Sequence, residues 1–114
     1  GAVYLFSTQG ATWTESQVLT APDVEFQDGF GGGLALSGDW LIVSSPLDDD
    51  LGIEAGAAHV FRRTGDRWTY HQKVLPETGD ALDTFGNHVA ADGSTFCVGV
   101  PTVSEFGISS GTVY

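Results

Sequence analysis

Apolar side chains alternate with small or polar ones in short stretches along the chain, which is the period-two pattern of β-strands. We expect strands over residues 30–37, 40–45, 56–63, 67–75, 85–92 and 95–100, with further strand residues in 1–6 and 12–20. Tight turns are expected at Gly38-Asp39, at Asp92-Gly93 and around Thr64-Gly65-Asp66. No window combines ten or more residues, a cap and an apolar stripe, so the pattern predicts no helix.

The same pattern returns after 55 residues, and at that shift the chain aligns with itself without a gap. Identical residues occupy 17 of the 59 overlapping pairs and gather at glycines, aromatic residues and turns. The stretch GAVYLF at 1–6 falls on GAAHVF at 56–61, which in turn falls on GTVY at 111–114. The chain is therefore a repeat protein.

Four antiparallel strands in each period are typical of a β-propeller blade. We therefore predict an all-β fold of tandem four-stranded antiparallel blades, propeller-like, with about two repeats. Residues 1–29 would form the C-terminal half of a preceding blade and a loop, 30–84 a complete blade with its loop, and 85–114 the first three strands of the next. A flat β-sandwich is the alternative, but it offers no reason for a constant period.

The ordered set of short motifs resembles the FG-GAP repeat, the blade of integrin α-subunit propellers and of many secreted or surface-anchored bacterial proteins. Phe30-Gly31, the strand end at 44–46 and GAAHVF at 56–61 carry the resemblance in one repeat, and Phe85-Gly86, 99–101 and 111–114 carry it in the next. The glycine-alanine-proline signature keeps only its proline in both repeats. The residues assigned to the structural motif are Asp28, Phe30, Gly31, Pro46, Gly56, Phe61, Trp68, Asp83, Phe85, Gly86, Pro101 and Gly111.

The resemblance implies an extracellular or cell-surface protein, and it implies calcium held by alternating acids in the first hairpin of many blades. That hairpin is only Ser37-Gly38-Asp39 in one repeat and Asp92-Gly93-Ser94 in the other, so the family's calcium motif is absent here. Asp48, Asp50 and Glu54 are the remaining candidate ligands, in a loop whose counterpart reads Val103-Ser104-Glu105. A solvated acidic loop is the simpler interpretation, and a weak calcium site or a cation bridge between molecules is the alternative.

Two recurring side chains, an aspartate and a tryptophan, are assigned structural tasks. Asp28 and Asp83 stand two residues before each Phe-Gly and are expected to accept backbone N–H bonds in their own turn. Trp13 and Trp68 recur at the start of an outer strand and are expected to pack between blades, with a sugar platform as the alternative. Trp40 has no counterpart and is assigned to the core or to an exposed contact.

Fifteen acidic and four basic residues give a net charge of −11, which disfavours nucleic acid and anionic lipid as partners. No apolar run approaches the length of a membrane span, so no membrane insertion is expected. Arg62, Arg63, Arg67 and Lys73 fall on one predicted hairpin, either as a charged solvent face or as a docking spot for an acidic neighbour. The single cysteine, Cys97, is expected to be a buried small hydrophobe.

Catalytic patterns are weak throughout. His59, His71 and His88 fall on three different predicted strands, none recurs, and no metal-binding histidine spacing is present. We therefore predict a non-catalytic structural or interaction module that contacts copies of itself, adjacent repeats, other surface proteins or glycans. A lectin- or adhesin-type propeller, calcium-assisted or not, is the alternative.

Two repeats do not close a ring, because propellers use about four to eight blades. The chain opens at the third strand of one blade, and it stops within the third strand of another. We expect a window of a longer tandem-repeat chain, or a protomer of a head-to-tail assembly that forms a closed ring or an open filament.

Overall fold

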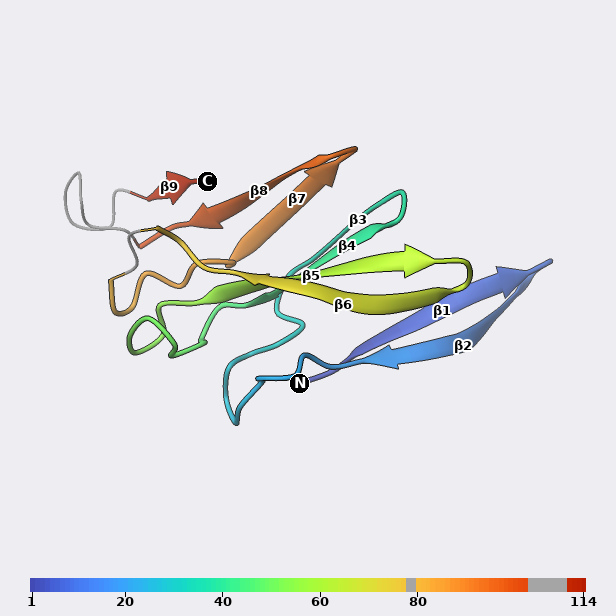
Figure 1. Ribbon diagram of the computed structural model, residues 1–114, viewed down its shortest axis with the longest axis horizontal. Helices are drawn as coiled ribbons and strands as arrows, with labels where there is room; N and C mark the ends of the chain where they lie inside the picture. The colour runs from blue at the N-terminus through green and yellow to red at the C-terminus, as the bar shows by residue number, and fades with distance from the viewer. Residues whose placement is uncertain (78–79, 103–110) are drawn as a thin grey trace.

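The computed structural model describes residues 1–77, 80–102 and 111–114, and every regular element in these ranges is a β-strand. The strands form three antiparallel sheets (Figure 1). The first sheet holds β1 (Val3–Gln9) and β2 (Thr12–Leu19). The second holds β3 (Leu34–Ser37), β4 (Trp40–Ser45), β5 (Ala57–Thr64) and β6 (Arg67–Val74). The third holds β7 (His88–Asp92), β8 (Thr95–Val100) and β9 (Thr112–Val113).

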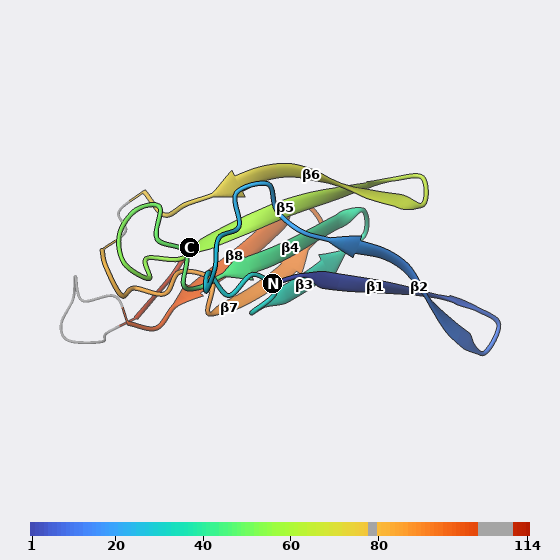
Figure 2. The same ribbon diagram turned by 90° about the horizontal axis from the view of Figure 1, so that it is seen from below.

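The three sheets stack face to face in chain order, with β3–β6 in the middle (Figures 1 and 2). The second and third sheets contact each other mainly through their first strands, β3 and β7. The first and second sheets contact each other through their last strands, β2 and β6. This confirms the predicted all-β, propeller-like arrangement of tandem blades.

The 55-residue repeat is also present in the hydrogen-bond register. A bulge interrupts the β1–β2 ladder between Leu5 and Phe6, and another interrupts the β5–β6 ladder between Val60 and Phe61. Similarly, Val113 lies opposite Gly99 in the third sheet, as Ala58 lies opposite Ser44 in the second. Equivalent residues in the sequence therefore occupy equivalent places in each blade.

Two apolar cores separate the sheets, because each central strand presents alternate residues to its two neighbours. On β4, Leu41 and Val43 face the first sheet, whereas Ile42 faces the third. The first core contains Val3, Leu19, Ala21, Phe30, Leu41, Val43 and Phe61. The second core contains Ala35, Ile42, Ala58, Val60, Phe85, Val98 and Val100.

The opening strand of each repeat is shorter than the sequence pattern indicates. Strands expected from residues 30 and 85 begin at Leu34 and His88, because Gly31 and Gly86 have φ values of 93° and 96°, which belong to a left-handed turn. The expected turn at Asp92-Gly93 is also wrong by one residue. Asp92 pairs with Thr95, so Gly93 and Ser94 make the turn.

The glycine at the start of the third strand and the Phe-Gly motif recur together because they contact each other between neighbouring blades. Gly56 forms a parallel bridge to Phe85 of the next blade, and a Cβ at Gly56 would overlap the backbone of Phe85. Gly1 stands in the same relation to the backbone of Phe30. A glycine in one blade thus allows the backbone of the next blade to approach it.

Substitution of Gly56 by Ala should lower the free energy of unfolding by more than about 3 kcal/mol, because the new Cβ collides with backbone that cannot rotate away. Gly65→Ala is the matched control: its φ is also positive, at 65°, but nothing lies within 4 Å of its Cβ position. The control should cost about 1 kcal/mol. Urea unfolding measures both, and equal losses would show that the blade contact is not what requires Gly56.

Candidate interaction surface

A glutamine side chain, called the Gln17 clamp below, links the first blade to the second through two hydrogen bonds. The Nε2 of Gln17 on β2 donates to the Trp68 carbonyl at 2.7 Å, and the Trp68 amide N donates to the Oε1 of Gln17 at 2.9 Å. Both bonds reach backbone groups on the outer strand β6. A single amide thereby satisfies one donor and one acceptor that would otherwise face the gap between two sheets.

The face of the β1–β2 hairpin that points away from the second blade carries exposed aromatic side chains. Tyr4, Phe6 and Trp13 are 59%, 54% and 68% exposed. Their counterparts one period later, His59, Phe61 and Trp68, are buried or half-buried against the first core and its neighbours. The same positions are therefore built for packing in one blade and are uncovered in the other.

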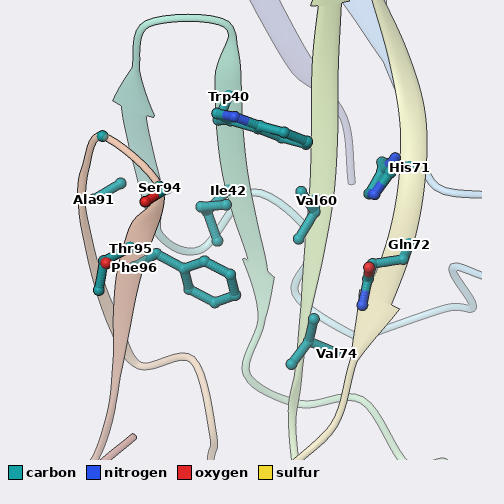
Figure 3. A pocket seen from close by; sticks show the side chains of 11 residues that line it. Trp40, Ile42, Val60, His71, Gln72, Val74, Ala91, Ser94, Thr95 and Phe96 are labelled. Atoms are coloured by element: carbon teal, nitrogen blue, oxygen red, sulfur yellow. The ribbon is translucent and has the colours of Figure 1, made fainter.

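A groove of about 220 Å³ opens on the opposite side of the middle blade, between it and the third blade. Figure 3 shows Trp40, Ile42 and Val60 along its floor, with the ring of Phe96 reaching in from β8 and Gln72 from β6. Gln72 is the counterpart of Gln17. The groove is mainly apolar. The amide of Gln72 stands in it at the position that corresponds to the Gln17 clamp of the first interface.

The predicted turn role of the recurring aspartates agrees with their hydrogen bonds. The Oδ2 of Asp28 accepts from the amide N of Glu25 at 2.6 Å, and the Oδ2 of Asp83 accepts from the amide N of Asp80 at 2.9 Å. Both aspartates are buried. The residue before each of them, Gln27 or Leu82, has a positive φ, so these bonds hold a turn that the residue type alone does not favour.

The candidate metal ligands Asp48 and Asp50 surround an ammonium group instead. Lys73 on β6 places its Nζ 2.7 Å from the Oδ2 of each, and 3.0 Å from the Oδ2 of Asp23. Glu54 is not part of this cluster; its backbone N donates to the side chain of Asp49. In the described residues no group of three or more histidine, cysteine or acidic side chains is arranged to hold a metal. The counterpart at 103–105 lies outside the described residues.

The placement of Lys73 departs from the predicted solvent-facing hairpin. Its side chain is only 13% exposed, and that of Asp48 only 3%, so this ion pair is largely shielded from water. Burial alone would lower the pKa of Lys73, but the hydrogen bonds to Asp48, Asp50 and Asp23 outweigh it and raise that pKa. For Asp23, burial raises the pKa, but Lys73 more than reverses this and leaves it below the usual value.

The arginines of that hairpin do lie at the surface, where Arg62 and Arg63 each cover an aromatic ring. The guanidinium of Arg62 lies 5.2 Å from the ring centre of Trp40, and that of Arg63 lies 5.8 Å from that of Trp68. Arg63 also pairs with Asp39 at 2.9 Å. Trp40 is half-buried beside the second core, so both of its predicted roles, in the core and at a surface contact, meet at one site.

His59 is buried completely between the first core and the acidic loop. Its Nε2 lies 3.1 Å from the Ser45 hydroxyl and its Nδ1 3.4 Å from the Tyr70 hydroxyl. Burial lowers the pKa of His59, and Lys73 adds to this, whereas the nearby Asp23, Asp48 and Asp28 oppose it. His71 and His88 lie on β6 and β7, so the three histidines occupy three strands as predicted.

A comparison with protein families matches the FG-GAP repeat to residues 13–61 and again to residues 68–114. This chain belongs to the FG-GAP repeat family. A search of curated proteins found no match. FG-GAP repeats are generally non-enzymatic and typically occur in extracellular or surface proteins. The part of the chain that the structure describes contains no helix with the length and apolar character needed to cross a membrane.

Most of the FG-GAP motif residues lie along the two blade interfaces, and two of them, Pro101 and Gly111, line a pocket beside β8 and β9. Phe30 and Phe61 are in the first core and meet edge to face, with ring centres 6.2 Å apart. Phe85 is in the second core, and Pro46 and Pro101 follow β4 and β8 directly. Gly111 stands just before β9. The motif residues in the two cores therefore describe how blades join.

Two positions differ from what their sequence context and recurrence predict. Cys97, expected to be buried, is exposed because its position corresponds to Ile42 on the face that points toward a following blade, and no described element covers that face. Trp13 is equally uncovered, although its counterpart Trp68 packs as predicted. Sequence alone did not indicate the Gln17 clamp or the role of Lys73, since polar residues on an outer strand usually face solvent.

Replacement of Lys73 by Met should lower the free energy of unfolding by about 3 kcal/mol, because it leaves the buried carboxylate of Asp48 without its counter-charge. Arg67→Met, at the exposed tip of the same hairpin, should change it by less than about 0.5 kcal/mol. Denaturant unfolding at neutral pH compares the two. Similar losses in both variants would contradict a special role for Lys73.

Acid should weaken the fold through His59. Its folded-state pKa lies below the unfolded value of 6.5, so the unfolded chain binds the proton more readily. The resulting stability is complete above pH 6.5 and is lost as the pH falls below it. His59→Gln should therefore flatten the decline in unfolding free energy between about pH 7 and pH 5. If the variant declines as steeply as the wild type, another group is responsible.

Proposed function

We propose that this chain is a non-catalytic, extracellular module that makes protein–protein contacts through the faces of its FG-GAP blades. The observation that carries the proposal is a pair of uncovered apolar surfaces, one on the outer face of the first hairpin and one between the middle and third blades. One is the aromatic face of β1–β2, with Tyr4, Phe6 and Trp13, and the other is the groove between β6 and β8. Exposed apolar surfaces rimmed by polar residues are typical of interaction sites.

The charge of the chain supports a protein partner. A net charge of −11 disfavours nucleic acid and anionic membranes, whereas aromatic side chains are enriched in protein interfaces. The extracellular placement rests on the family, whose repeats typically occur in extracellular or surface proteins. The partners that fit are copies of this chain, adjacent repeats or other surface proteins.

A non-catalytic role is supported by the hydrogen bonds and ion pairs that engage the side chains a catalytic site would need. The two ring nitrogens of His59 are both within reach of hydroxyl groups, on Ser45 and Tyr70, inside the packed blade. The acidic side chains nearest to it balance the charge of Lys73. In this arrangement His59 and the neighbouring carboxylates stabilise the folded blade.

Glycan binding is the second candidate, and the exposed indole of Trp13 favours it. An uncovered aromatic ring offers the flat apolar face on which sugar rings stack, and Trp13 is 68% exposed. A lectin-type module would use this ring directly, and a calcium-assisted one would also bind the ion near the acidic loop at Asp48–Asp50.

A glycan array probed with and without chelator separates the two candidates. The interaction module predicts no glycan signal above that of a Trp13→Ser control, and no heat on titration of calcium into the chain. A glycan signal that falls with chelator or with Trp13→Ser would overturn the proposal in favour of the lectin.

A further inference from the structure

We infer that His59 and Lys73 form an acid-sensitive latch on the two loops beside the middle blade, at residues 20–33 and 46–56. Lys73 holds both loops closed against β6, and protonation of the buried His59 in mild acid opens them. This pH response goes beyond the proposed function and does not depend on it.

The repeat shows that a blade does not need two bases at these positions. His59 on β5 lies opposite Lys73 on β6. One period earlier, at the same place in the β1–β2 ladder, Tyr4 lies opposite Val18. The residue one period after His59 is again a tyrosine, Tyr114. The middle blade therefore carries a titratable pair where the architecture accepts a tyrosine and a valine.

His59 packs at its position in the way that tyrosine does. Its ring meets that of Phe30 edge to face, with ring centres 5.3 Å apart. One period later, Tyr114 meets Phe85 edge to face, with ring centres 5.8 Å apart. Phe30 and Phe85 are the equivalent phenylalanines of the Phe-Gly motif. The packing thus calls for an aromatic ring, and the ability of His59 to take up a proton is additional to it.

The closed arrangement suits only the neutral form of His59. The ring is completely buried, and its two nitrogens face the hydroxyl groups of Ser45 and Tyr70. A neutral imidazole accepts one hydrogen bond and donates the other, whereas an imidazolium donates both. The hydroxyl that donated to the ring would then need a new acceptor, and the buried charge would have no water around it. Protonation therefore favours a state in which the ring reaches water.

The groups that face His59 identify the parts that must open. Tyr70 and Lys73 face it from β6, Asp23 and Asp28 from the loop at 20–33, and Asp48 from the loop at 46–56. The three carboxylates favour the charged ring, but burial is the largest effect and holds the pKa of His59 below 6.5 while the loops are closed. Solvation in an open state returns this pKa toward its ordinary value. Opening therefore takes up a proton and becomes more favourable as the pH falls.

Lys73 keeps the same loops closed when His59 is neutral. Its Nζ lies 3.0 Å from the Oδ2 of Asp23 in one loop and 2.7 Å from the Oδ2 of Asp48 and Asp50 in the other. These carboxylates raise the pKa of Lys73, so its ammonium stays charged while His59 titrates. Lys73 in turn helps to hold the pKa of Asp23 below its usual value. Mild acid therefore acts on His59 and leaves the Lys73–Asp23 ion pair charged.

Amide hydrogen exchange, followed by NMR on the 114-residue chain, tests the inference. The amide N of Leu47 donates to the Asp28 carbonyl at 3.0 Å, between the two loops, and that of Asp50 donates to the Oδ1 of Asp48 at 3.1 Å. After correction for intrinsic exchange, their opening constants should rise about tenfold between about pH 7.5 and about pH 5.5. They should also exceed the global unfolding constant from urea at each pH, because the blades stay folded when the loops open.

The repeat itself supplies the decisive variants. His59→Tyr restores the residue of the other repeats and should abolish the rise, and His59→Gln should do the same if the tyrosine does not fit. Lys73→Val should increase loop opening at both pH values and keep the tenfold difference, because the trigger is intact. His71→Tyr is the matched control on an exposed histidine of β6, and it should respond to pH as the wild type does.

Loop amides that ignore pH in the wild type would overturn the inference. An undiminished rise in both His59 variants would do so too, because it would assign the response to another group. Loop opening no greater than global unfolding would show that no local latch exists. A His59 ring resonance that titrates at or above pH 6.5 in the folded chain would contradict the closed, neutral state. The glycan array judges the proposed function separately, since it does not depend on loop opening.

Discussion

The structure depends on one constraint: each blade is a sheet with apolar side chains on both faces, and neither face is stable in water. The middle blade satisfies this requirement by placing Leu41 and Val43 against one neighbour and Ile42 against the other. Burial of such side chains contributes about 1.5–3 kcal/mol each, so the blades stabilise one another and not themselves. The close approach of Gly56 to Phe85 is a condition for this stacking, since any larger residue would hold the sheets apart.

Much of the fold was predictable because the packing of each blade on the next requires particular residues at a regular spacing. Glycines, aromatic residues and turn residues recur every 55 positions wherever one blade meets the next, and the strands and their order follow from that recurrence. The first strands were predicted too long because the Phe-Gly motif reads as strand when only hydrophobicity is considered. In the structure Gly31 turns the chain toward the preceding blade and hydrogen-bonds to Ser44 at 3.0 Å.

Apart from the hydrogen bonds of Gln17, which recurs as Gln72, the features that the sequence did not reveal are found once per chain and not once per blade. Lys73 corresponds to Val18 in the preceding repeat, and His59 to Tyr4, so neither stands out in a self-comparison. Lys73 collects acidic residues from two loops that are distant in sequence, and only the fold brings them together. Cys97 illustrates the opposite problem, because its apolar neighbours suggest a core position that only a further blade would provide.

The clamp made by Gln17 has a consequence for how such repeats diverge. Its amide recognises the main-chain N–H and C=O of Trp68 and no part of the indole. Every residue other than proline carries that same pair of groups, so the bond places no demand on the identity of the residue it holds. Mutations at the gripped position therefore leave these two hydrogen bonds in place, although they change the packing of the Trp68 indole on the first core. Neighbouring repeats can therefore acquire unlike surfaces while the spacing between them is preserved.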